Sequence, residues 1–272
     1  MDFSVLMSVY IKESPEFLEK SLESVLITQT LTPSDVVLVK DGPLTNELED
    51  VIKKFKSEFP NQLNVIGLEK NLGLGKALNI GLENCKYDLV ARMDSDDISV
   101  EHRFETQLRY FEENHTLDVV GGNIIEFYDF PSQPVAERKV PSTMQEIVEM
   151  MKRRNPMNHV SVMFKKSAVL RAGGYKHLPY LEDYYLWVRM VETNCLMINI
   201  DDTLVYVRTG AEMYKRRGNK EYIRGWYTLQ QKMKAMGNVN SLNVAFNMAS
   251  IIGFIYMPVG LKELAYKKIL RK

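Results

Sequence analysis

The sequence has little cysteine, no net charge, and no repeated or low-complexity segment. Its two cysteines, Cys85 and Cys195, lie far apart without Cys-x-x-Cys spacing, which argues against a disulfide framework or a thiolate metal site. Basic and acidic residues both number 35, so no overall positive field attracts nucleic acid, and we expect no such partner. The start, Met-Asp-Phe-Ser, lacks the basic region of a signal peptide. We therefore expect a cytoplasmic protein with reduced thiols.

The sequence does contain enough apolar material for a large core, with 45% hydrophobic residues. In the first hundred residues, short apolar runs alternate with helical patterns, which predicts an α/β fold. Apolar runs without internal alternation are typical of strands buried on both faces, so we expect a mostly parallel sheet with helices on both faces. The expected strands cover 5–9, 35–41, 63–68 and 89–91. Of the three expected helices, the first begins at Pro15, the second ends at Phe59 and the third ends at Glu83.

The second half of the chain is less regular. Its patterns predict one or two strands over 119–130, a loop over 131–141, a helix over 143–154, a strand over 159–164, a short helix from Ser167 to Gly173-Gly174, a helix from Leu181, strands over 195–200 and 204–207, and a helix over 222–236.

Three carboxylates, Asp94, Asp96 and Asp97, follow directly after the strand expected at 89–91. In open α/β sheets, ligands bind beyond the carboxyl ends of the strands. Three like charges so close together repel one another unless they are exposed or a cation holds them, and Mg²⁺ and Mn²⁺ prefer such oxygen ligands. The alternative is an acidic turn that precedes the next helix, with Ser99 as the N-cap of that helix. The turn alone leaves both interpretations open.

Two other loops in the first half are candidate ligand sites. The segment 73–81 lacks the spacing of a dinucleotide fingerprint or a phosphate-binding P-loop, so a tight turn into a helix is favoured, although Lys76 could reach a diphosphate. Asp41 ends a strand where a carboxylate could accept hydrogen bonds from a nucleotide base, or it could simply belong to the turn before Gly42-Pro43.

Glu182 and Asp183 precede an aromatic group in the second half. Tyr184, Tyr185 and Trp187 could form a wall on which a sugar ring stacks, with one of the two carboxylates taking a proton from an acceptor hydroxyl. The alternative is a negatively charged first turn that the helix dipole favours. Three further candidates have equally plain alternatives: His159 as a structural residue, and Arg216 and Arg217, beside Lys215, as a solvated basic loop rather than a phosphate site.

Several motifs occur together in one order along the chain. They are Ser8-Val-Tyr10 with Glu13, Val37-Leu-Val-Lys-Asp-Gly-Pro43, Asn71-Leu-Gly73, Ala91-Arg-Met-Asp-Ser-Asp-Asp97, Asn158-His159, Gly173-Gly-Tyr175, Glu182-Asp-Tyr-Tyr-Leu-Trp187 and Arg216-Arg-Gly218. This combination resembles the inverting family 2 glycosyltransferases with a GT-A fold, particularly the bacterial branch that builds capsule, exopolysaccharide or O-antigen. The resemblance covers roughly residues 1–220.

The resemblance implies a role for each motif. Asp94 and Asp96 match the DxD motif that binds Mn²⁺ or Mg²⁺ on a nucleoside-diphosphate sugar, and Asp97 shares or replaces one of those roles. Asp183 matches the catalytic base, with Glu182 beside it. The donor would contact Tyr10, Glu13, Asp41, Lys76, Arg92, Asp94, Ser95, Arg216 and Arg217, and the acceptor would contact Trp187, His159 and Tyr184. Lys40-Asp41-Gly-Pro departs from the commoner Asp-Asp-Gly-Ser.

The resemblance also implies an activity: transfer of a sugar from a nucleoside-diphosphate sugar, expected to be a UDP-sugar, to a lipid-linked saccharide, expected to be a polyprenyl diphosphate. The alternatives are a metal-dependent nucleotidyltransferase and an inactive scaffold of the same fold. Both acidic clusters are intact, which favours the glycosyltransferase. In this interpretation 1–220 form the catalytic domain, with a nucleotide-sugar half over about 1–100 and an acceptor half over about 101–220, and 221–272 form a helical segment.

The last part of the chain is mostly apolar from 242 to 261 and then basic. Asn243, Asn247 and Pro258 interrupt the apolar run, and crossing a bilayer needs about 20 apolar residues, so we expect the segment to lie in the membrane interface. Each nearby Lys or Arg would add about 1 kcal/mol at an anionic leaflet. This predicts peripheral binding to the inner membrane face; the alternative is packing on the catalytic domain or on a second copy in a homodimer.

Overall fold

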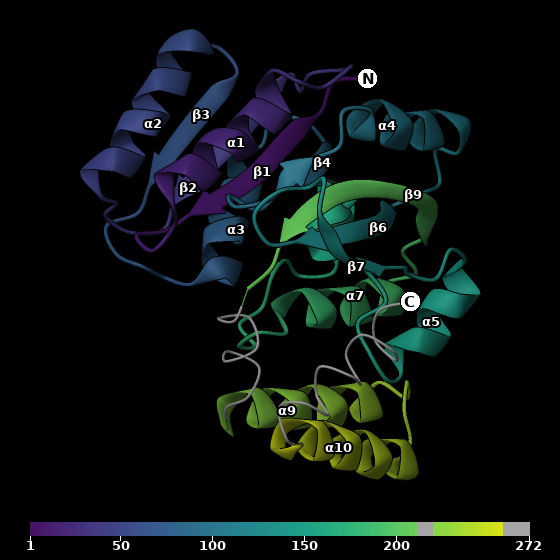
Figure 1. Cartoon of the computed structure of the whole chain (residues 1–272). Coiled ribbons are helices and arrows are strands. Elements are labelled where there is room, and N and C mark those ends of the chain that lie inside the picture. Colours follow the sequence, from purple (N-terminus) through teal and green to yellow (C-terminus); the bar gives the residue numbers. More distant parts are fainter. Residues whose placement is uncertain (211–219, 258–272) are drawn as a thin grey trace.

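The fold is described from a computed structural model, which covers residues 1–210 and 220–257 (Figure 1). The strands are β1 (Ser4–Val9), β2 (Asp35–Lys40), β3 (Leu63–Gly67), β4 (Leu89–Arg92), β5 (Ile98–Ser99), β6 (Val119–Phe127), β7 (Pro134–Arg138), β8 (Met163–Lys165) and β9 (Met197–Arg208). The helices are α1 (Pro15–Leu26), α2 (Asn46–Glu58), α3 (Leu74–Asn84), α4 (Arg103–Glu113), α5 (Met144–Met151), α6 (Lys166–Arg171), α7 (Glu182–Glu192), α9 (Lys220–Ala235) and α10 (Ser241–Tyr256), with a 3-10 turn at His159–Ser161.

All strands except β7 belong to one path, in the order β3-β2-β1-β4-β8-β6-β9-β5, and β7 pairs with β6. The strands β3, β2, β1 and β4 pair in parallel, as the alternation of strands and helices predicts. The second half adds antiparallel pairs at β4–β8, β8–β6 and β9–β5, while β6 and β9 are parallel. The sheet therefore has a parallel half, β3-β2-β1-β4, and a second half in which parallel and antiparallel pairs are mixed.

Helices cover both faces of the sheet, as predicted. The core on one face packs against α1, α2 and α4, and the core on the other packs against α3, α6 and α7 (Figure 1). In β1, Val5 and Met7 point to the first core and Leu6 to the second, because side chains alternate across a strand. The carboxyl ends of β1, β2 and β4 consequently open at the same edge, where a ligand crevice forms in open α/β sheets.

Several local predictions were wrong. Ser99 is not a helix cap: it pairs with Val205 in β5, and α4 begins only after His102. The segment 131–141 is not all loop, because β7 pairs there with β6. The strand expected at 159–164 starts with the 3-10 turn and is strand only from Met163.

The two strands expected at 195–200 and 204–207 are one strand, β9. Its pairing with β6 shifts register near Asn123, and the exposed residues Asp201 and Asp202 sit at that irregularity. A bulge of this kind interrupts the sequence pattern without ending the strand.

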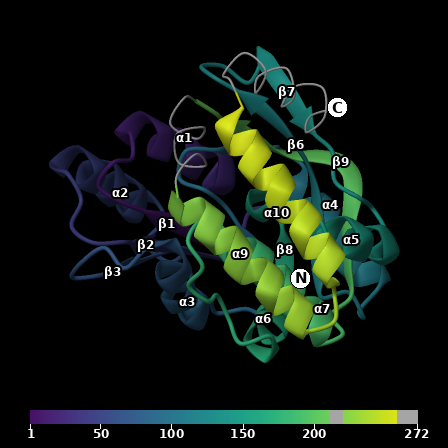
Figure 2. The same ribbon diagram turned by 90° about the horizontal axis from the view of Figure 1, so that it is seen from below.

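The helices α9 and α10 pack against the domain, side by side beneath α7 (Figures 1 and 2). Tyr184 of α7 shares one buried cluster with Trp226 and Leu229 of α9 and Val244 of α10. Within 1–210 and 220–257, no helix is long and apolar enough to span a bilayer. The described part of the C-terminal segment thus packs against α7 of the same chain, which is the first of the two alternatives to the membrane prediction.

Candidate active site

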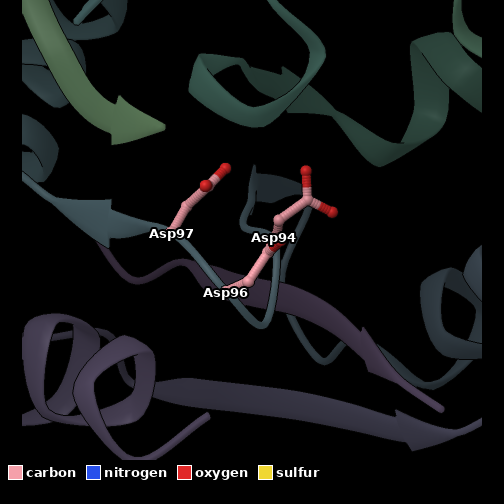
Figure 3. Close-up of side chains that lie close together, drawn as sticks. All are labelled: Asp94, Asp96 and Asp97. Atoms are coloured by element: carbon pink, nitrogen blue, oxygen red, sulfur yellow. The ribbon is translucent and has the colours of Figure 1, made fainter. Parts of the chain in front are cut away.

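The three aspartates of the acidic turn meet at the carboxyl end of β4. One carboxylate oxygen from each of Asp94, Asp96 and Asp97 lies within 4.8 Å of the others. Figure 3 shows the three side chains leaving one tight turn and reaching the same side of it. Asp94 is half-exposed, whereas Asp97 is buried, so the cluster runs from the surface into the protein.

Neighbouring elements hold the acidic turn in place. The Ser21 hydroxyl of α1 donates to the Asp94 carbonyl at 2.8 Å. The Ser95 hydroxyl donates to the Glu13 carboxylate at 2.6 Å, which joins the turn to the loop after β1. On the other side, the backbone N–H of Arg208 donates to the Asp97 carboxylate at 2.7 Å. The turn is thus fixed by elements from both halves of the chain.

The cluster carries more negative charge than its surroundings neutralise. Arg92 donates to the Asp94 carboxylate at 2.5 Å and is its buried counter-ion, with only 1% of its side chain exposed. Burial, and then the charges of Asp94 and Glu13, raise the pKa of Asp96 to about 7. Burial and the charges of Asp96 and Asp94 also raise the pKa of Asp97. Because Arg92 is buried, it supports Asp94 and does not itself face a donor molecule.

A divalent cation fits this cluster on chemical grounds. The three carboxylates supply hard oxygen ligands, and the raised pKa values of Asp96 and Asp97 indicate that further negative charge is unfavourable there without a cation. A bound cation would relieve that repulsion and would leave positions free for the oxygens of a diphosphate. Asp94, Asp96 and Asp97 are the residues that would hold it.

Asp41 organises the loop that leads into α3. Its two carboxylate oxygens accept the backbone N–H groups of Leu72 at 2.7 Å and Gly73 at 3.0 Å. At Gly42, which follows, φ is +93° and a Cβ would lie 2.7 Å from the Asn71 backbone nitrogen, so only glycine fits this approach. A carboxylate has about four lone-pair positions, so Asp41 retains capacity to accept from a base.

Across the site, Glu182 and Asp183 form the first turn of α7. The Asn155 side-chain amide donates to the Asp183 carboxylate at 2.6 Å, while its oxygen accepts the N–H of Met157. Glu182 lies against the start of α3, where a Cβ on Gly75 would come within 3.1 Å of its side chain. Burial raises the pKa of Glu182 to about 7.

Tyr175 is a buried residue on which charges of both acidic groups act. The charges of Arg92, Asp183 and Asp94 all act on its hydroxyl, whose pKa is raised mainly by burial. Its hydroxyl lies 2.9 Å from His159 Nε2, and its backbone N–H donates to Asn79 of α3 at 2.7 Å. Burial and the Arg92 charge lower the pKa of His159, so the ring is neutral near pH 7. His159 is therefore a neutral, hydrogen-bonded residue inside the site.

The predicted aromatic wall was wrong. Tyr184 and Trp187 are both fully buried. The Tyr184 hydroxyl donates to the Met151 carbonyl at 2.5 Å, and its ring packs edge-on against Trp226. The reason is that α7 is covered on one side by the sheet and on the other by α9, so its aromatic residues fill two cores and leave no open face.

The remaining predicted residues fall into two groups. Tyr10 is 38% exposed at the end of β1, and Lys76 is exposed in the first turn of α3, so both are accessible to a ligand. Arg216 and Arg217 lie outside the described residues.

The sequence patterns assigned no role to three residues of the site: Asn155, Tyr175 and Arg208. Tyr175 belongs to the motif Gly173-Gly-Tyr175, which carried part of the resemblance but gave this residue no role. Asn155 and Arg208 gave no signal, because each acts on an acid that lies far from it along the chain.

Comparison with known proteins agrees with this geometry. The model of the family Glycosyl transferase family 2 matches residues 4–178. The amylovoran biosynthesis glycosyltransferase AmsE of Erwinia amylovora is 39% identical, with 98% of each chain covered. An Escherichia coli UDP-Gal:alpha-D-GlcNAc-diphosphoundecaprenol beta-1,3-galactosyltransferase is 36% identical, covering 99% of this chain and 97% of the relative.

A solved structure has a similar fold. The structure of Staphylococcus aureus TarS 1-349 in complex with UDP-GlcNAc superposes with a TM-score of 0.67 at 18% identity, covering 98% of this chain and 75% of that one. The fold and the acidic clusters thus define a GT-A glycosyltransferase. The chain belongs to glycosyltransferase family 2, and the resemblance seen in the sequence is confirmed.

Proposed function

We propose that Asp183 is the general base of an inverting sugar transfer and that the acidic turn holds the cation and diphosphate of the donor. The observation that supports this assignment is the contact between the first turn of α7 and the start of α3: Glu182 lies against Gly75, and Asp41 holds the loop that leads into the same helix. Asp183 Oδ2 accepts a hydrogen bond from the Asn155 amide. This bond fixes the orientation of the carboxylate that would accept the proton of the acceptor hydroxyl.

The mechanism divides the work between the two groups. Asp183 takes the proton of the acceptor hydroxyl, whose oxygen attacks the anomeric carbon from the side opposite the diphosphate. One base suffices for a direct displacement, so the configuration inverts. A cation at Asp94, Asp96 and Asp97, Mn²⁺ or Mg²⁺, supplies charge neutralisation for the departing diphosphate. Arg92 is the counter-ion of Asp94.

We propose a UDP-sugar as donor and a lipid-linked saccharide, carried on a polyprenyl diphosphate, as acceptor. Support comes from the name of the Escherichia coli relative, which specifies UDP-galactose and a diphosphoundecaprenol-linked sugar, and from the UDP-GlcNAc bound to the structural neighbour. The amylovoran enzyme adds support for a role in surface polysaccharide synthesis. Tyr10, Glu13, Asp41, Lys76 and Ser95 are the proposed donor-site residues, and His159 the proposed acceptor-site residue.

A panel of UDP, GDP, CMP and dTDP sugars, with and without Mn²⁺, tests the donor by thermal shift. A ligand at 100 times its dissociation constant adds about 2.7 kcal/mol, which raises the unfolding midpoint measurably. If no nucleotide sugar stabilises the protein with metal present, the donor assignment fails. Proton NMR of the new anomeric signal, with a diphosphate-lipid saccharide as acceptor, then tests inversion. A retained configuration contradicts the single-base mechanism.

The helix α10 supports the proposed attachment to the inner membrane surface. It contains no charged residue, and its outward side exposes Leu242, Phe246, Ile252 and Tyr256. Its buried side includes Asn247, which donates to Gln230 and to the Lys152 carbonyl. The outward side of α10 is thus apolar, unlike that of a helix that faces water, which suits burial of this side in a lipid interface.

Vesicle flotation tests this attachment. The double variant Phe246→Ser, Ile252→Ser should float less with anionic vesicles than the wild type, while Ile27→Ser, at a similarly exposed residue after α1, should not change. Equal flotation of all three proteins contradicts the membrane proposal. If instead the double variant shifts a dimer to monomer in sedimentation velocity, the outward side of α10 is a homodimer contact.

A further inference from the structure

Arg208, the last residue of β9, contacts the acidic turn through both its backbone and its side chain. Its backbone N–H donates to the Asp97 carboxylate at 2.7 Å, and its side-chain Nε donates to the Asp96 carbonyl at 3.2 Å. Its Nη1 donates to the Tyr128 carbonyl, just after β6, at 3.0 Å. One residue therefore binds two of the three aspartates and ties them to the end of β6.

Stacking fixes the plane of the Arg208 guanidinium. The group lies 3.8 Å from the ring centre of Phe17 in α1 and 4.6 Å from that of Phe127 in β6. Held between two rings and bound to carbonyls at both edges, the side chain has one available orientation. The acidic turn is thereby clamped between α1 and β6.

The contribution of Arg208 is one of shape rather than of charge. In the turn, an ion pair joins Arg92 to Asp94, whereas Arg208 reaches the Asp97 carboxylate through its backbone N–H. The Arg208 side chain reaches a carbonyl of the turn, not a carboxylate. It can therefore set the direction of the peptide that carries Asp96 and Asp97 without occupying an oxygen that a cation would use.

We propose that Arg208 is a positioning residue that holds Asp96 and Asp97 in the orientation that binds a divalent cation. The proposal rests on the cation role of the acidic turn given above. Without the Arg208 side chain, its backbone N–H still holds Asp97, but the peptide that carries Asp96 loses its hydrogen bond and its stacked support. Repulsion would then move the Asp96 carboxylate away from its neighbours, and a binding cation would have to bring it back at a cost. Residues that orient metal ligands in this way affect metal affinity by about 10–100-fold.

The test compares Arg208→Lys and Arg208→Ala with wild type, using Mn²⁺ alone and Mn²⁺ with UDP as probes. Free Mn²⁺ is measured by electron paramagnetic resonance, which needs no turnover. Arg208→Ala should weaken Mn²⁺ binding by about 10–100-fold. Arg208→Lys keeps the charge but loses the planar fork and the stacking, so it should also bind Mn²⁺ more weakly, by an intermediate factor.

Arg171→Lys and Arg171→Ala are the matched controls, because Arg171 is exposed on α6 and far from the turn in its contacts. Both should bind Mn²⁺ as the wild type does. Wild-type affinity in Arg208→Lys overturns the proposal, since charge alone would then suffice; this variant also decides the matter if Arg208→Ala fails to fold by circular dichroism. If the wild type and the controls bind no Mn²⁺ with UDP present, the cation role of the turn itself is overturned, and the positioning role with it.

Discussion

The acidic turn at Asp94, Asp96 and Asp97 and the acidic start of α7 at Glu182 and Asp183 handle negative charge differently. In the turn, burial and mutual repulsion raise the pKa of both Asp96 and Asp97, and Arg92 offsets only part of the charge. At α7, the helix N-terminus favours negative charge, and the Asn155 amide satisfies one oxygen of Asp183. On the proposed assignment, the first group holds a cation, and the second accepts a proton and needs no cation.

The two groups therefore suit different tasks. A site for a metal and a diphosphate needs several convergent oxygens, whereas a base needs one oriented carboxylate. Variants that remove one acid from either group should fail in different ways.

Asp183→Asn removes the proposed base and leaves its size unchanged. General-base catalysis contributes about 10²–10⁴-fold, so kcat should fall by about that factor. Steady-state kinetics with a saturating donor measure it. Glu182→Gln is the control on the neighbouring acid, and a larger loss in that variant would exchange the roles of the two residues.

Asp96→Asn removes one of the three repelling charges. Mn²⁺ affinity should fall by at least about tenfold, because a ligand is lost. Without metal, the variant should be more stable than wild type at pH 8, since the wild type must ionise a buried carboxyl whose pKa is about 7. Thermal melts in a chelator give the second result. If the variant is less stable than the wild type without metal, repulsion among the three carboxylates does not destabilise the turn.

Asn155→Asp places a second carboxyl against Asp183, which now accepts from an amide at 2.6 Å. Two carboxyls at this distance share a proton, so the apparent pKa of the pair rises. The acidic limb of the kcat/KM profile should move to higher pH, and further than in Asn155→Ala, which removes only the amide donor that favours the ionised carboxylate. An unchanged profile in Asn155→Asp would separate Asn155 from the base.

Glu182→Gln should change how stability depends on pH. Burial raises the folded-state pKa of Glu182 from 4.5 to about 7, so the folded protein binds this proton more tightly than the unfolded chain does. Stability is then lost as pH rises from about 4.5 to about 7, and the loss is complete above that window. The variant should show a shallower decline, by about 1 kcal/mol or about 2–4 °C in Tm. Parallel slopes in melts at pH 5 and pH 8 contradict this.

The sequence allowed good prediction where function depends on local pattern. The strands β1 to β4 and the two acidic groups each lie within one short segment, so spacing and apolar runs locate them. The residues that hold these acidic groups in place could not be predicted in the same way. Arg208 is 111 residues from Asp97 and Asn155 is 28 residues from Asp183, and only the folded chain brings them together.

Tyr184 and Trp187 show a second limit. Aromatic residues after a pair of acids suggest an open binding wall, but α7 is buried from Tyr184 to Met190. A helix buried all round has the same composition as one with an aromatic surface, and only the packing of α9 against its outer side decides between the two.

The most direct test of the division between the two acidic groups is one calorimetric titration of UDP with Mn²⁺ into wild type, Asp96→Asn and Asp183→Asn. We expect Asp96→Asn to bind UDP with Mn²⁺ at least about tenfold more weakly than the wild type. Asp183→Asn should bind within about twofold of the wild type, because the proposed base contacts the acceptor and not the diphosphate. Equal losses in the two variants, or a loss confined to Asp183→Asn, would contradict this division.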